Sequence, residues 1–265
     1  MISAKVAIAL CWTLLITTLI FLFAPIFIVV SVSFSPSSVF AFPPDGFSLR
    51  WYETALQADA LLSSIWLSLQ IAFLSTFVSL LIGTLCAIAI TKKYVPGGEI
   101  IATFMASPLM LPGLVLGIAF LHASRKMGFY DTYINLMLAH VVITMPFVMR
   151  TVLASLALFD FALIDAAQTL GSSYYRSLWK VLLPNIMPGF LSGGLFAFIA
   201  SFDNYPVSMF LVDVRTKTLP IQLLNQLETL PDPTVAAISS MLIVGTVIVL
   251  FLCDRLVGLN RMANL

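Results

Sequence analysis

Asp165–Pro184, DAAQTLGSSYYRSLWKVLLP, is the most informative segment of this sequence for its fold class. It is polar, whereas 60% of the 265 residues are hydrophobic and only 9% are charged. Because a soluble globular chain averages about a quarter charged residues, this chain cannot cover its apolar side chains in water. The sequence therefore predicts an integral membrane protein that holds one polar segment, 158–186, outside the lipid.

Apolar runs on both sides of this segment are long enough to cross a bilayer. A transmembrane helix needs about 20 apolar residues. Six runs meet that requirement, and they cover approximately 6–33, 63–91, 100–122, 133–153, 189–212 and 234–254. The first run is longer than the apolar core of a signal peptide, so we expect it to remain as a helix. The prediction is an all-α fold of six transmembrane helices in a single domain, 1–265.

The basic residues predict the orientation, because cytosolic loops are enriched in Lys and Arg. With the N-terminus in the cytosol, eight of the 13 basic residues are cytosolic: Lys5, Lys92, Lys93, Arg150, Arg176, Lys180, Arg255 and Arg261. The other five lie outside: Arg50, Arg125, Lys126, Arg215 and Lys217. This bias places both termini and the polar segment in the cytosol. Because the basic residues are scattered, we expect no nucleic-acid partner.

The polar segment predicts two short helices joined by a turn. Asp160 can cap a first helix that runs to Leu170. Gly171 can then adopt the positive φ that closes a helix without a Cβ clash. Ser172 or Ser173 can cap the second helix through its hydroxyl.

The second helix is expected to end at the proline, Pro184. Its apolar residues recur with helical spacing on one face, and they are Tyr175, Leu178, Trp179 and Leu182. Helices this short are marginal alone in water. We therefore expect the pair to pack against a partner surface.

The same segment resembles the EAA loop of ABC importer permeases. The matching positions are Asp165, Ala166, Ala167, Gly171, Val181, Leu183 and Pro184. Asp165 stands where that family usually has Glu. The resemblance implies a type I ABC importer permease fold, in which 158–186 is a helix-turn-helix coupling loop that docks on a cytosolic ATPase. The coupling residues that it implies are Asp165, Ala166, Ala167, Gly171, Ser172, Leu183 and Pro184.

Four further segments resemble the permeases of the spermidine/putrescine type, a group that includes opine transporters. They are GFSLRWYETAL (46–56), SPLMLPGLVLGIAFL (107–121), LAHVVITMPFVMRTV (138–152) and SFDNYPVSMFL (201–211). The resemblance implies a bacterial inner-membrane location and several partners. These are two ATP-binding subunits, a second and homologous permease chain, and a periplasmic substrate-binding protein.

No feature of the chain predicts that it hydrolyses ATP itself. A phosphate loop has the pattern GxxxxGK[ST], and none of the six lysines follows a glycine. We therefore expect no cofactor on this chain, with ATP and Mg bound by the partner ATPase. An intramembrane protease is disfavoured because no HExxH or nucleophile motif is present. An ion-coupled carrier built from inverted repeats finds no internal repeat to support it.

Two polar residues inside the apolar runs leave alternatives open. His140 is either a polar contact between helices or a ligand or proton site. Asp203 falls in the outer half of the fifth run, where a carboxylate costs about 2.5–3.5 kcal/mol and usually faces a cavity. It is either an anionic contact for a cationic substrate or a partner in a structural salt bridge or hydrogen bond.

The predicted substrate pathway comprises Ser201, Asp203, Asn204, Tyr205 and Trp51. Polyamine permeases often carry a second acid where this chain has Asn204. This departure favours a less charged amine or an opine-like compound over a long polycation. The alternative is a permease of the same type for another small solute, amino-acid-like or anionic.

Three segments carry local expectations. Pro108 and Pro112 predict either a tolerated kink in the third span or a bend that shapes a pathway. Residues 49–56 predict a short interfacial helix anchored by Trp51 and Tyr52. Residues 220–227 predict a short amphipathic helix on the outer surface.

Overall fold

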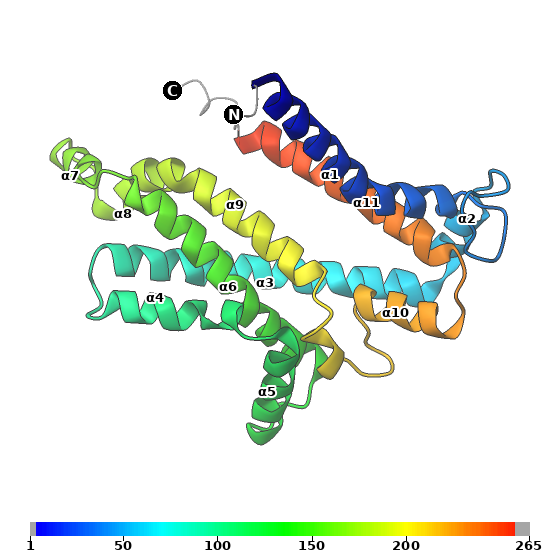
Figure 1. Ribbon diagram of the computed structural model, residues 1–265. Helices are drawn as coiled ribbons and strands as arrows, with labels where there is room; N and C mark the ends of the chain where they lie inside the picture. Colours follow the sequence, from blue (N-terminus) through cyan, green and yellow to red (C-terminus); the bar gives the residue numbers. More distant parts are fainter. Residues whose placement is uncertain (1–3, 258–265) are drawn as a thin grey trace. The chain divides into compact units, whose positions relative to one another are not determined.

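The computed structural model describes residues 4–257, and no strand is assigned within that range (Figure 1). The elements in chain order are α1 (Ala4–Ser33), α2 (Arg50–Gln57), α3 (Asp59–Thr91), α4 (Gly98–Ala106), η1 (Ser107–Met110), α5 (Gly113–Lys126), α6 (Thr132–Ala157), α7 (Ala162–Thr169), α8 (Tyr174–Ser177), η2 (Leu178–Leu182), α9 (Leu183–Phe202), η3 (Ser208–Phe210), α10 (Leu219–Thr229) and α11 (Thr234–Val257). The all-α prediction is confirmed. Arg261, counted above on the cytosolic side, and the C-terminus lie outside the described residues.

The apolar spans agree with the sequence in number when one bent helix pair counts as a single span. Within the described residues, five helical segments are long and apolar enough to cross a membrane. The pair formed by α4 with η1 and α5 brings the number to six. The predicted runs 63–91 and 133–153 correspond to α3 and α6, each a few residues longer than expected.

The contacts of the chain divide it into two compact units. Of the described residues, the first contains 4–62 and Leu223–Phe251, and the second contains Ser63–Gln222 together with 252–257. In the first unit, α2 is tied to the end of α1: the Trp51 indole donates to the Ser35 carbonyl (2.9 Å), and the Tyr52 and Ser33 hydroxyls lie 2.7 Å apart. The helix expected at 49–56 is confirmed, and its two aromatic residues contact the end of α1 and the loop that follows it; the interfacial role expected for them stays a prediction.

The core of the second unit is formed where α6 and α9 pack along each other (Figure 1). Glycines four residues apart on α9 make this close packing possible. A Cβ at Gly189 would meet the Ser155 hydroxyl and the Thr151 carbonyl, and one at Gly193 would meet the Thr151 hydroxyl. Small residues at this spacing let two helix backbones approach closely in a membrane.

The third span is broken by 107° between α4 and α5, and the sharp turn is visible in Figure 1. Pro108 and Pro112 both lack the N–H that a continuous helix needs. Leu111, which precedes the second proline, is extended with φ −93° and ψ 142°, as the residue before a proline favours. The prolines therefore cause a full break rather than a tolerated kink.

The fifth span differs from its prediction at both ends. The helical run begins at Tyr174 and ends at Phe202, whereas the apolar run predicted 189–212. Pro184 does not end a helix, because it lies in the first turn of α9, where a missing N–H is tolerated. The π-helical turn η2 immediately precedes α9, and the Leu183 amide donates a hydrogen bond to the Leu178 carbonyl.

Candidate functional site

The polar segment forms a helical hairpin at one end of α6 and α9 (Figure 1). The Asp160 carboxylate accepts a hydrogen bond from the Ala162 amide (2.9 Å) at the start of α7. Gly171 has a φ of +87°, and its amide donates to the Gln168 carbonyl while the Ser172 amide donates to Ala167. These two bonds are the Schellman arrangement that ends a helix, so the expected conformation of Gly171 is confirmed.

The second helix of the hairpin, α8, is capped by Ser173. Its hydroxyl accepts a hydrogen bond from the Arg176 amide at 3.4 Å. The hydroxyl of Ser172 instead donates to the Ser173 carbonyl, also at 3.4 Å. Of the two serines proposed from the sequence, Ser173 is therefore the cap.

The hairpin is held by its own chain. Ile164 is fully buried in the cluster that includes Leu156 and Ile186. The loop after α3 supplies two more contacts. The Lys92 ammonium lies 4.1 Å from the centre of the Phe161 ring, and the Tyr94 and Tyr174 hydroxyls lie 3.0 Å apart. The hairpin therefore has a defined position in the second unit.

The predicted apolar face of the second helix divides into buried and exposed side chains. Leu182 is buried and Leu178 is half-buried, but Tyr175 and Trp179 are 77% and 71% exposed. The buried face instead runs through Ser177, and the π turn η2 changes the 3.6-residue period from which the face was read. Large side chains thus remain exposed on the hairpin: Leu163, Leu170, Tyr175 and Trp179. We name this set the hairpin surface.

The residues that match the EAA pattern lie beside the hairpin surface. Asp165, Ala166, Gly171 and Pro184 are exposed, and the remaining matched positions are partly buried. An exposed apolar surface of this kind suits contact with another protein or with lipid. The roles of these residues in coupling stay a prediction.

The second candidate site is the turn that follows α9. The sequence predicted that Asp203 lies inside the fifth membrane-spanning helix. In the structure it lies at the C-cap of α9, and its side chain is exposed. Its carboxylate makes no hydrogen bond or ion pair with any residue in 4–257 whose contacts are described. The neighbouring Asn204 is engaged locally, because its amide oxygen accepts a hydrogen bond from the Val207 amide (3.1 Å).

The turn packs directly on α5. A Cβ at Gly113 would lie 2.9 Å from the Cβ of Pro206, and one at Gly117 would lie 2.8 Å from the Phe210 ring and 3.0 Å from the Val207 carbonyl. These glycines were not chosen from the sequence as site residues. Their four-residue spacing, visible in PGLVLG, is the signal that could have found them.

Buried hydroxyls and one histidine lie next to the turn. Ser201 is only 3% exposed, and its hydroxyl lies 3.0 Å from that of Ser75 and 2.7 Å from Nδ1 of His140. Nε2 of His140 lies 3.0 Å from the Ser208 hydroxyl. His140 is therefore a polar contact between helices, and Ser201 is turned into the protein rather than toward open space.

The loop beyond η3 is anchored to the start of α6. The Thr132 hydroxyl donates to one carboxylate oxygen of Asp213 (2.7 Å), and the Arg215 and Thr216 amides donate to the other. The bond from Thr132, with help from these amides, holds the pKa of Asp213 below its usual value. The segment 203–213 is thus attached to α5 and α6.

Trp51 belongs to the first unit, where it is 6% exposed. Its indole N–H donates a hydrogen bond to the Ser35 carbonyl, and the Arg50 guanidinium lies 4.1 Å from the ring centre. The structure therefore gives Trp51 a packing role next to α1. Its place in the substrate pathway stays a prediction.

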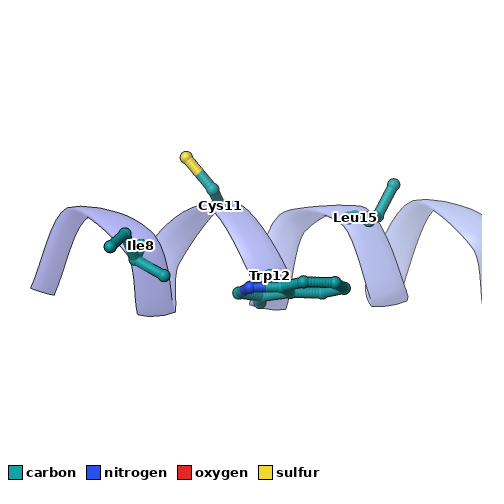
Figure 2. Close-up of a pocket in the computed structure, with 4 residues that line it drawn as sticks. All are labelled: Ile8, Cys11, Trp12 and Leu15. Carbon is teal, nitrogen blue, oxygen red and sulfur yellow. The ribbon is translucent and has the colours of Figure 1, made fainter. Parts of the chain in front are cut away.

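A shallow hollow lies on α1. Figure 2 shows the four residues that line it, which are Ile8, Cys11, Trp12 and Leu15. No charged group lines it, and the residues follow i, i+3, i+4, i+7 spacing. This face suits lipid tails or an apolar neighbour.

These features define a helical membrane protein that crosses the bilayer several times. They are the apolar spans, the broken third span and the polar hairpin packed against α6 and the loop after α3. The chain belongs to the family of binding-protein-dependent transport system inner membrane components, whose model matches residues 79–259. Membership establishes a transport component of the inner membrane rather than an enzyme. It also implies ATP-binding subunits and a partner permease.

Relatives of known function extend the match over most of the chain. The spermidine/putrescine transport system permease protein PotC of Haemophilus influenzae is 30% identical over 241 residues, 91% of this chain and 93% of the relative. The putrescine transport system permease protein PotI of Escherichia coli K12 is 27% identical over 239 residues, 88% and 85% of the two chains. The resemblance to permeases of the spermidine/putrescine type is confirmed.

Solved structures share the fold at lower identity. A bacterial ABC transporter that imports the acidic polysaccharide alginate matches with a TM-score of 0.74 and 19% identity, over 96% of this chain and 98% of the other. The methionine ABC transporter MetNI matches with a TM-score of 0.57 and 21% identity, over 75% and 94%. These matches confirm the type I permease fold.

Proposed function

We propose that this chain forms half of the pathway of an ATP-driven importer for a small cationic nitrogen compound, polyamine-like or opine-like. The observation that carries the proposal is the exposed, unpartnered carboxylate of Asp203 at the C-terminus of α9. The last carbonyls of a helix carry a partial negative charge, so a carboxylate there is unfavourable until a cation approaches. The names of the relatives PotC and PotI agree with a cationic solute.

Asn204 limits the charge that the turn can offer. Its side chain stabilises the turn through Val207 and adds no negative charge beside Asp203. One carboxylate suits one ammonium group at a time, which favours a diamine or an opine-like compound over a long polycation. An oxyanion would be repelled by the same carboxylate, although a molybdenum transport permease, ModB of Haemophilus influenzae, is 29% identical over 63% of this chain.

The remaining partners follow from the hairpin and the family. We infer that the hairpin surface and Asp165 dock on one of two ATP-binding subunits, which hold ATP and Mg. The second permease is inferred to be a different, homologous chain, and a periplasmic binding protein delivers the solute. In this arrangement the hairpin and both termini are cytosolic. The 20 residues of α9 span about 30 Å, so with the hairpin in the cytosol we expect Asp203 to lie toward the outside.

A panel of solutes tests the proposed solute class. The complete complex is reconstituted in liposomes with its binding protein, and ATP hydrolysis is measured with putrescine, spermidine, an opine, a neutral amino acid and molybdate. We expect the amines or the opine to stimulate hydrolysis at least fivefold, because each presents a cationic nitrogen in its side chain or backbone to Asp203. Stimulation by molybdate alone would contradict the proposal.

A further inference from the structure

We propose that His140 is a positioning residue that holds the turn carrying Asp203 in the pathway. This inference rests on the proposed function, because it assigns His140 a role that acts through the carboxylate. The structural basis is a bridge in which the two ring nitrogens contact Ser201 and Ser208, at 2.7 and 3.0 Å. These serines bracket the segment in which Asp203 lies.

Imidazole is suited to this bridge. A neutral ring has one N–H donor and one acceptor nitrogen, and a serine hydroxyl can serve either as donor or as acceptor. His140 is 1% exposed and both serines are buried. In such a place an unpaired polar atom is costly, so the imidazole depends on both serines to satisfy its two ring nitrogens.

The bridge is part of a chain of polar contacts that reaches α3. Ser201 also contacts Ser75 on that helix (3.0 Å), and one turn after His140, Thr144 contacts Ser79 (2.8 Å). The two contacts differ in what they fix. The Thr144–Ser79 pair joins α6 to α3 alone, whereas the His140 bridge joins α6 to both ends of the turn.

Between the serines, the bonds of the turn are all short-range. The Asp203 and Asn204 amides donate to the Ile199 and Ser201 carbonyls, the Asn204 side chain accepts from the Val207 amide, and the Met209 amide donates to the Tyr205 carbonyl. These bonds stay within α9 and the turn, and none of them joins the turn to α6. On its other side the turn rests against Gly113 and Gly117 of α5. We infer that the bridge and these glycines together fix where the Asp203 carboxylate lies. Without the bridge, the carboxylate would sample several positions and bind a cation less well.

Uptake kinetics in the reconstituted complex test this role, with putrescine as the probe. His140→Leu should raise the KM about fivefold or more, since two buried hydrogen bonds are lost, and leave Vmax and the yield of complex near wild type. Thr144→Val, which removes a buried hydroxyl contact one turn away, is the matched control and should stay within twofold. A loss of yield with unchanged KM would overturn the positioning role.

A double variant shows whether His140 acts through Asp203. On an Asp203→Asn background, His140→Leu should add less than a twofold change in KM, because no carboxylate remains to be positioned. A full additional effect on that background would overturn the proposal.

A labelling experiment separates this inference from the proposed function. In a chain whose Cys11, Cys86 and Cys253 are replaced by Ala, Tyr205→Cys reports on the turn through its rate of reaction with a water-soluble thiol reagent. His140→Leu should raise that rate at least fivefold, and Thr144→Val should not. An unchanged rate would overturn the role of His140 even if Asp203 binds substrate. A raised rate together with normal uptake by Asp203→Asn would uphold the bridge and refute the proposed function.

Discussion

Asp203→Asn should lower uptake of the cationic solute tenfold or more, with the complex assembled normally. The substitution keeps the shape of the side chain and removes its charge. A hydrogen bond to a charged group contributes about 1.5–3 kcal/mol, and about 1.4 kcal/mol corresponds to a factor of ten. Because the side chain is exposed and has no described partner in the chain, its loss should not disturb folding.

The matched control for this variant is Asp131→Asn. Asp131 caps α6 by accepting from the Ile134 amide (2.8 Å), and Asn caps a helix as well as Asp does. This control removes one negative charge from a loop of the same unit without altering the turn. Uptake should stay close to wild type. Full uptake by Asp203→Asn, or an equal loss in both variants, would contradict the role of Asp203.

Gly171→Val should uncouple ATP hydrolysis from transport, with the spans inserted normally. The φ of +87° at Gly171 is strained for a β-branched residue by about 1–3 kcal/mol. No atom lies within 4 Å of the added Cβ position, so the effect arises from the backbone alone. We expect the hairpin to lose its Schellman bonds and change angle. Solute-stimulated ATP hydrolysis and uptake should both fall at least tenfold.

Gly128→Val provides the control for the backbone effect. Gly128 has a φ of +82° and equally open space around its Cβ position, but it lies in the loop before α6. Its substitution should leave both activities within a fewfold of wild type. Gly171→Asn should retain most activity, because Asn tolerates positive φ. Equal losses in the two Val variants would indicate general destabilisation rather than uncoupling.

The sequence could predict the hairpin because its signals are local. Asp160, Gly171 and Ser173 each act on a backbone group within three residues. Such capping interactions depend on residue type and spacing alone. The spacing did not show that this face divides between buried Leu182 and exposed Trp179, because a π turn changes the helical period and no residue type marks that turn reliably.

The end of the fifth span could not be found by counting apolar residues. The run remains largely apolar beyond Phe202, but the Asn204 side chain accepts a hydrogen bond from the Val207 amide. Pro206 also cannot continue a helix, because it has no backbone N–H. These local signals outweigh hydropathy. As a result, Asp203 lies at a helix end. The free-energy cost of burying a carboxylate inside a membrane helix, which the sequence analysis assigned to it, does not apply there.

The bridge around His140 lies beyond single-sequence reasoning. His140 and Ser201 are 61 residues apart, and Ser75 and Ser201 are 126 apart. Nothing local in the sequence states that these side chains meet, because the contacts depend on how α3, α6 and α9 pack. The glycines of α9 predict close packing with some helix, but the partner helix is known only from the structure.

Uptake of labelled putrescine into liposomes tests most directly whether this chain is half of an ATP-driven importer of cations. The liposomes carry the complete complex and the binding protein, with ATP on the side of the ATPase and ionophores that collapse the proton and sodium gradients. We expect uptake to continue under the ionophores and to stop when ATP is replaced by a non-hydrolysable analogue. Uptake that stops with the ionophores while ATP is intact, and persists with the analogue, would contradict an ATP-driven importer.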